Sequence, residues 1–174
     1  MDITDRSMKL MTTALDMEEK GQKHYAEAAL ICRNALGREV FSLLSDYEVR
    51  HMVRIKEIYT ALKGGSAWTE GLASFVVPSD LTDVFRILTQ KHKPDRTEAD
   101  EKKAIDIGME FESASIKFYH ELGDLSADPL EKKFADLMVA EERGHLNLLA
   151  DLKAYYEDPE GWFMAKDRAG LDGA

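Results

Sequence analysis

The sequence predicts an all-α protein, a bundle of four long helices arranged as two antiparallel helical hairpins joined by a long crossover. Apolar residues recur with a period near 3.6 along four long stretches, and no stretch alternates with period two as a half-buried strand would. Breaks of a few residues separate the first stretch from the second and the third from the fourth, which is typical of antiparallel neighbours. A much longer connection separates the two pairs.

The first predicted hairpin consists of helices at about 4–33 and 38–63. Apolar or small residues at helical spacing define the inward face of the first helix. The segment NALG at 34–37 is expected to end it. The second helix is expected to stop at Gly64 and Gly65, because glycine commonly follows the last turn of a helix.

The second predicted hairpin consists of helices at about 97–122 and 129–157. The start of its second helix carries three signals in order. Asp128 is an N-cap residue, Pro129 suits the first helical position, and Glu131 is placed as a capping-box glutamate. This hairpin therefore has a well-marked turn.

The connection between the hairpins, a crossover at 64–96, is too long to lack structure in a compact domain. Its segment LTDVFRILTQ at 81–90 predicts a short helix. After the last long helix, residues 158–174 are expected to form a C-terminal tail. The chain length fits a single domain over residues 1–174.

Composition and charge exclude several classes of function. A net charge of −10 argues against a nucleic-acid partner, which requires a basic surface. No apolar stretch is long enough to cross a bilayer, and the beginning of the sequence lacks the apolar segment of a secretory signal. With Cys32 as the single cysteine, neither an intramolecular disulfide nor a pair of thiolate ligands can form. We expect a cytoplasmic protein that binds neither nucleic acid nor membrane.

Polar residues interrupt the inward apolar face of every predicted long helix near its middle. Each helix carries one carboxylate there, and two helices add a histidine one turn later. These candidate metal ligands are Glu18, Glu48, His51, Glu112, Glu142 and His145.

The same residues also reveal an internal repeat. A spacing of 94 residues relates Glu18 to Glu112, Glu48 to Glu142, His51 to His145 and Tyr25 to Tyr119. The two hairpins therefore resemble copies of one unit, each with a Glu, a Glu-x-x-His and a Tyr.

Metal binding explains this pattern physically. Residues three apart share a helix face, so both side chains of a Glu-x-x-His can reach one centre. Four carboxylates converging in a core would repel one another and resist ionisation, whereas two divalent cations balance their charge. Oxygen and imidazole ligands without thiolate suit iron or manganese and also accommodate zinc. The sequence therefore predicts a dinuclear metal site.

Each element alone has a simpler explanation, as a solvated Glu-x-x-His pair, a boundary glutamate or a core tyrosine. These features occur together, in register, in both hairpins. It is therefore improbable that the simpler explanation holds for every one of them. Histidines without a partner at metal spacing are expected at the surface: His24, His92 and His120. Glutamates beside the candidates but rotated away from them are expected as rim charges: Glu19, Glu110 and Glu141. Cys32 is interpreted as a small hydrophobic residue.

The order Glu, Glu-x-x-His, Glu, Glu-x-x-His on four helices resembles the ferritin-like diiron carboxylate proteins. Within them, MEEKGQKHYAEAA followed by YEVRHMVRIKEIYTAL resembles the rubrerythrin-type branch. The ending PEGWF…AGLDGA is similar to the chain ends of small members of that branch. The resemblance implies a ferritin-like bundle that holds two irons.

The resemblance also implies a role for each candidate. Glu18 and His51 would bind one iron, Glu112 and His145 the other, and Glu48 and Glu142 both. Tyr25 and Tyr119 would donate hydrogen bonds to the carboxylates.

By the same resemblance, we expect an oxidoreductase whose reduced diiron centre reacts with peroxide or dioxygen. Rubrerythrins proper carry a rubredoxin domain with two Cys-x-x-Cys pairs, which this sequence lacks, so a separate electron-transfer protein is the expected donor. They also carry a further glutamate one turn from the position of Glu112, where this sequence has Met109 and Ser115. Val49 stands where bacterioferritin has its haem methionine. We expect a homodimer or larger homo-oligomer.

Three alternatives are left open. An iron-binding or storage protein would oxidise iron only to load it and would require a cage. A diiron hydroxylase would need an apolar access pocket beside the metals. A helical interaction module that has lost its metal is least favoured, because all six ligand positions are intact.

Overall fold

The computed structural model describes residues 3–75, 81–92 and 99–172. These residues form helices and no strand, which confirms the all-α prediction. The helices are α1 (Ile3–Ile31), α2 (Ala35–Lys63), α3 (Glu70–Ala73), α4 (Leu81–Lys91), α5 (Ala99–Leu125), α6 (Pro129–Glu157) and α7 (Pro159–Asp172). None of the described helices combines the length and apolarity needed to cross a membrane.

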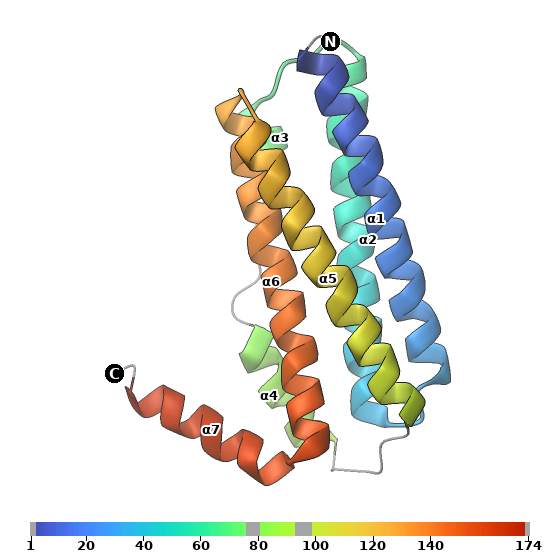
Figure 1. Cartoon of the computed structure of the whole chain (residues 1–174), viewed down its shortest axis with the longest axis vertical. Coiled ribbons are helices and arrows are strands. Elements are labelled where there is room, and N and C mark those ends of the chain that lie inside the picture. Colours follow the sequence, from blue (N-terminus) through green and yellow to red (C-terminus); the bar gives the residue numbers. More distant parts are fainter. Residues whose placement is uncertain (1–2, 76–80, 93–98, 173–174) are drawn as a thin grey trace.

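Four of these helices build the predicted bundle (Figure 1). Helices α1 and α2 lie side by side as one antiparallel hairpin, and α5 and α6 form the second. The crossover returns the chain to the opposite end of the bundle, with α4 packed on α6, so that α2 and α5 run in the same direction. This topology brings the middles of all four long helices together.

The break in the first hairpin is shorter than predicted, and the last three residues of the segment NALG belong to the second helix. Helix α2 begins at Ala35 rather than near residue 38. Asn34 is its N-cap, because its side-chain oxygen accepts hydrogen bonds from the backbone N–H groups of Leu36 (3.0 Å) and Gly37 (3.2 Å). Helix α2 ends at Lys63, before Gly64, as predicted.

The turn of the second hairpin confirms Asp128 as an N-cap, since its side chain accepts from the backbone N–H of Leu130 at 2.8 Å. Glu131 does not serve as a capping-box residue. It is fully buried, and its carboxylate accepts hydrogen bonds from Ser7 (2.6 Å), Arg6 (2.9 Å) and Ser126 (2.6 Å). It therefore joins the beginning of α1 to the beginning of α6.

The third long helix continues past its predicted end at 122 to Leu125. This continuation faces α6, where a Cβ at Gly123 would make an ordinary contact, 3.4 Å from the Cβ of Ala135. The predicted helix start at Thr97 lies outside the described residues.

The crossover contains the predicted short helix as α4, and also α3, which the sequence analysis did not predict. Thr69 caps α3. Arg54 of α2 donates hydrogen bonds to the carbonyl oxygens of Gly71, at 2.8 Å, and Ser74. These contacts hold the first part of the crossover against α2.

The expected tail is instead helical as α7, which extends away from the bundle (Figure 1). The Asp158 side chain accepts from the backbone N–H of Gly161 at 2.9 Å, and a proline follows Asp158, so the residues that end α6 also start α7. Trp162 is buried against Phe85 and Tyr155, with ring centroids 5.1 and 5.8 Å away. These contacts anchor the first turns of α7.

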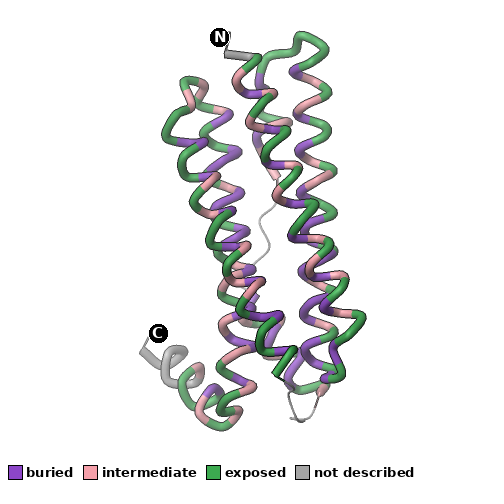
Figure 2. Tube along the Cα trace, turned by 45° about the vertical axis from the view of Figure 1, so that its right-hand side comes forward, coloured by how far each residue is buried: buried purple, intermediate pink, exposed green. Residues whose placement is uncertain are grey.

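Buried residues line the facing sides of the helices, as Figure 2 shows, and form two apolar clusters. One cluster includes Tyr25 and Leu149, and the other includes Met11 and Met138. On α1, Glu18 lies between Met11 and Tyr25, and the polar residues of the other long helices lie between members of the two clusters in the same way. A polar layer is therefore enclosed between two apolar ones.

Candidate metal centre

The structure brings all six predicted ligand residues into this polar layer. Each is at most 3 % exposed. Helices α1 and α5 each supply one glutamate, while α2 and α6 each supply a Glu-x-x-His. These side chains form two groups that could each hold a metal ion. The first is Glu18, Glu48, His51 and Glu142, and the second is Glu48, Glu112, Glu142 and His145.

The two groups overlap, which is the main geometric feature of the site. Within each group, one ligand atom from every residue lies within 4.8 Å of the others. Glu48 and Glu142 belong to both groups, and each offers two oxygens. The arrangement therefore fits two neighbouring ions with two shared carboxylates.

His51 directs its Nδ1 atom into the first group. This nitrogen lies 3.0 Å from Glu18 Oε2, 3.5 Å from Glu48 Oε2 and 3.4 Å from Glu142 Oε1. Oxygens from three helices thus surround one imidazole nitrogen.

His145 directs the same atom into the second group. Its Nδ1 lies 3.2 Å from Glu142 Oε2, and 3.7 Å from both Glu48 Oε1 and Glu112 Oε2. The two halves of the cluster are therefore built alike, as the 94-residue repeat predicts.

The two tyrosines link the hairpins reciprocally. Tyr25 of α1 donates to Glu112 of α5, and Tyr119 of α5 donates to Glu18 of α1. Burial, followed by the neighbouring carboxylates, raises the pKa of both phenols well above its ordinary value. Both hydroxyls therefore stay protonated and act as donors, as the resemblance implies.

The two shared carboxyls resist ionisation in the metal-free cluster. Burial raises the pKa of Glu48 well above its ordinary value, and Glu18 and Glu142 raise it further. Burial also raises the pKa of Glu142 strongly, with added repulsion from Glu18 and Glu112. Like charges in a dry layer thus favour protons on the shared pair.

The two outer carboxyls behave in the opposite way. Burial would raise the pKa of Glu18, but hydrogen bonds from Glu48 and His51 and the charge of His51 lower it to about 2. For Glu112, burial acts to raise the pKa, but the nearby His145 outweighs it, so the pKa falls below the ordinary value. In each hairpin, the pKa of one carboxyl is therefore raised and that of the other is lowered.

Two buried atoms in this cluster indicate that a cation fits it. Among the described residues, Glu142 Oε1 and His145 Nδ1 have no hydrogen-bond partner although neither is exposed to solvent. A buried polar atom without a partner is costly unless an ion or water satisfies it. Because both atoms belong to the overlapping groups, a metal ion would satisfy them both.

Glu141 is a functional candidate that the sequence analysis misplaced. Predicted as a rim charge, it is only 7 % exposed, and its Oε2 lies 2.6 Å from His51 Nε2. Glu141 does point away from Glu142 on α6, as predicted. It points toward α2, however, and not toward solvent. One helix viewed alone gives no signal of which neighbour lies on that side.

The other predictions for polar neighbours are mostly confirmed. Glu19, Glu110 and His120 are exposed. His24 and His92 are partly buried rather than on the open surface, because they bond to the Ala104 carbonyl and the Glu39 carboxylate, respectively. None of these five residues belongs to either group of potential ligands.

A cavity of about 190 Å³ reaches the cluster from the side of α2. Its lining combines three apolar side chains, two arginines and the His51–Glu141 pair. The lining residues are Tyr47, Arg50, His51, Arg54, Phe75, Met138 and Glu141. The cavity thus adjoins the His51–Glu141 pair at the edge of the cluster.

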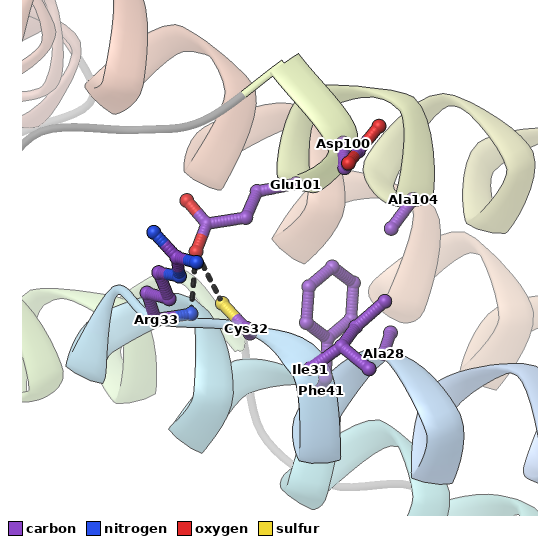
Figure 3. A pocket seen from close by; sticks show the side chains of 8 residues that line it. All are labelled: Ala28, Ile31, Cys32, Arg33, Phe41, Asp100, Glu101 and Ala104. Carbon is purple, nitrogen blue, oxygen red and sulfur yellow. Dashed lines mark hydrogen bonds between the residues drawn. The ribbon is translucent and has the colours of Figure 1, made fainter.

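A second cavity, of about 210 Å³, lies at the α1–α2 turn and has a different character (Figure 3). There Glu101 accepts hydrogen bonds from the Cys32 thiol and from the backbone N–H groups of Arg33 and Asn34. Burial, with Glu101, raises the pKa of Cys32 to about 12. The thiol is therefore unreactive, in keeping with its interpretation as a small hydrophobic residue.

Comparison with known proteins gave one family match. The family model described as Rubrerythrin covers residues 9–153. That range contains all six candidate ligands and both tyrosines. Searches of curated proteins and of solved structures gave no match.

Proposed function

The chain belongs to the rubrerythrin family, and on that premise we propose that its buried cluster binds two iron ions and reduces peroxide or dioxygen with electrons from a separate protein. The observation that supports this function most strongly is the pair of overlapping buried groups that share Glu48 and Glu142. Overlapping carboxylate and histidine sets on four helices are the arrangement of dinuclear carboxylate centres.

The donor set favours iron. Glu18 and His51 would hold one ion, Glu112 and His145 the other, and the two shared glutamates both. Two divalent ions neutralise four carboxylates, and carboxylate with imidazole suits iron better than a thiolate-selective metal. Manganese and zinc satisfy the same charge balance, so metal analysis decides among them.

When bound, the iron pair would supply redox equivalents that reduce the oxygen–oxygen bond. The residues of the chain would prepare the centre for this reaction. The tyrosine hydroxyls orient Glu112 and Glu18 through hydrogen bonds. The apolar clusters on both sides exclude bulk water, and the cavity beside His51 admits a small oxidant.

The additional glutamate of rubrerythrins has no counterpart at either position expected for it. Ser115 is buried, and Met109 packs partly buried against the apolar cluster at the Tyr25 end. With fewer negative charges than a site of that type, the centre should stabilise its ferric form less and accept electrons more readily. This supports a function that depends on an external donor.

The proposed function is tested by mixing the anaerobically prepared diferrous protein with peroxide in a stopped-flow instrument. We expect one fast oxidation without a donor and repeated turnover when a reduced electron-transfer protein, such as a rubredoxin, is supplied. The His51→Ala and His145→Ala double variant is the control and should show neither. Absence of oxidation in the wild-type diferrous protein would contradict the proposal.

The cavity beside His51 favours oxygenation of a small organic molecule as a second candidate function. Tyr47, Phe75 and Met138 supply the apolar lining that such a substrate needs. The two functions differ in the fate of the oxygen atoms. With ¹⁸O-labelled dioxygen, a reductase places both labelled atoms in water, whereas a hydroxylase places one in an organic product and the other in water.

A further inference from the structure

The two histidines of the cluster have unequal surroundings. In each hairpin, the residue that precedes the shared glutamate reaches the histidine of the other hairpin. Glu141 precedes Glu142 and bonds to His51, whereas Tyr47 precedes Glu48 and packs against His145. The 94-residue repeat relates Tyr47 to Glu141, so the same position carries different chemistry in the two halves.

On the His51 side, the contact is a short hydrogen bond to a carboxylate. Glu141 Oε2 lies 2.6 Å from Nε2, while Nδ1 of the same ring faces Glu18, Glu48 and Glu142. The bond is buried, with side-chain exposures of 4 % for His51 and 7 % for Glu141. A single imidazole thus joins the cluster to a carboxylate that belongs to neither ligand group.

On the His145 side, the corresponding neighbour is an aromatic ring. The ring of Tyr47 lies 5.0 Å from that of His145 at an angle of 46°. The Arg50 guanidinium lies over the same Tyr47 ring, 5.0 Å from its centre. A tyrosine ring face gives an imidazole packing area but no anionic acceptor.

The difference has a direct consequence for a bound metal. A carboxylate that accepts the Nε2 proton fixes the tautomer whose Nδ1 lone pair faces the metal, holds the ring in place and makes it more basic. Loss of such a partner typically weakens metal binding about 10- to 100-fold. The Tyr47 ring packs against His145 but offers no anionic acceptor, so it supplies only part of this effect.

We infer that Glu141 is a positioning residue that makes the two metal positions unequal, so that the ion on His51 binds first and more tightly than the ion on His145. The inference rests on the proposed function, because it takes the two ligand groups as metal positions. The tighter position is also the one that the cavity reaches, since His51 and Glu141 line it.

The first experiment titrates the metal-free full chain with Co²⁺ by calorimetry and by absorption spectroscopy. The wild type should bind in two resolved steps. Glu141→Gln keeps the shape but removes the charge, and should weaken the tighter step about 10- to 100-fold while leaving the other unchanged. Glu141→Leu removes the acceptor as well and should weaken the same step further. Glu19→Gln, at an exposed neighbour of Glu18, should change neither step.

A second pair of variants locates the effect. When Glu141→Gln is added to His145→Ala, the remaining ion should bind more weakly. When it is added to His51→Ala, the remaining ion should be unaffected, because the imidazole through which Glu141 acts is gone. A merely structural role for Glu141 would weaken binding in both backgrounds.

A third measurement needs no substitution at Glu141. Crystals of wild-type protein loaded with one equivalent of Co²⁺ should show anomalous scattering beside His51. Equal affinities in the wild type, equal weakening of both steps by Glu141→Gln, or a first ion beside His145 would each overturn the inference while leaving a dinuclear site intact. If the wild type binds no metal at all, the proposed function fails as well.

Discussion

The imidazole rings of His51 and His145 lie stacked across the interface between the two hairpins, with centroids 5.4 Å apart and planes inclined by 22°. Each is the last residue of a Glu-x-x-His, and they are separated by 94 residues in the sequence. These two imidazoles lie among four carboxylates and out of contact with solvent. Potential metal ligands therefore occupy a buried layer where apolar side chains would otherwise pack. The middle of the bundle is therefore suited to bind cations rather than to maximise hydrophobic stability.

Removal of both imidazoles should abolish tight metal binding. The double variant His51→Ala and His145→Ala leaves only oxygen ligands and opens space in both groups, so neither ion keeps a nitrogen ligand. Metal content is measured by inductively coupled plasma mass spectrometry after gel filtration. His120→Ala, at an exposed histidine, is the control and should keep the wild-type content. Unchanged metal content in the double variant would refute the site.

The metal-free protein should lose stability as pH rises from mildly acid to neutral. The pKa values of Glu48, Glu142 and His51 are raised above their ordinary values of 4.5, 4.5 and 6.5. For His51, burial acts to lower the pKa, but the surrounding carboxylates outweigh it. Groups with a raised folded-state pKa contribute stability that is present below the unfolded-state pKa and lost as pH rises through the folded-state value.

The opposite influence comes from Glu18 and Glu112, whose pKa values are lowered. Their contribution is lost only as pH falls below the ordinary value of 4.5. Bound metal requires deprotonated ligands. The metal-loaded protein should therefore gain stability as pH rises above 4.5, opposite to the metal-free protein. Thermal melts of apo and loaded protein across this range measure both profiles. The double variant Glu48→Gln and Glu142→Gln should flatten the apo profile, and a flat wild-type profile would contradict the pKa shifts.

Gly108 should be intolerant of a side chain, because Tyr25 lies against it. A Cβ there would lie 2.9 Å from Tyr25 Cε1 and 3.1 Å from Leu149 Cδ1. Gly108→Ala should therefore destabilise the protein by about 1–3 kcal/mol and disturb the Tyr25–Glu112 bond. Gly144→Ala is the matched control in α6, where a Cβ meets Leu81 at an ordinary 3.4 Å. Denaturant unfolding that gave both variants equal stability would count against the close packing.

Glu131 should contribute more stability than a surface glutamate. Its buried carboxylate accepts hydrogen bonds from Ser7, Arg6 and Ser126 and so joins α1 to the second hairpin. Glu131→Ala should cost about 2–4 kcal/mol, because it removes the buried acceptor that these three side chains share. Glu110→Ala, at an exposed position, should change stability by less than about 0.5 kcal/mol. Equal effects of the two substitutions in urea unfolding would contradict this role.

The features that the sequence predicts best are those that repeat along the chain. Helical periodicity identifies the four long helices, and the 94-residue repeat identifies the six polar residues that the structure brings together. The features it misses depend on contacts between elements. Glu141, Glu131 and Glu101 are buried carboxylates whose partners lie on other helices or in a turn. Trp162 likewise anchors α7 through rings that α4 and α6 bring together.

The central claim is a buried dinuclear iron centre that turns over rather than stores iron, and the most direct measurement is the iron retained per chain. Metal-free protein is given excess Fe(II) in air, separated by gel filtration and analysed for iron and for assembly size. The account predicts about two iron ions per chain, the number that balances four buried carboxylates. Retention of no iron would contradict the metal centre, and retention of many ions per chain in a large hollow assembly would contradict the oxidoreductase in favour of a store.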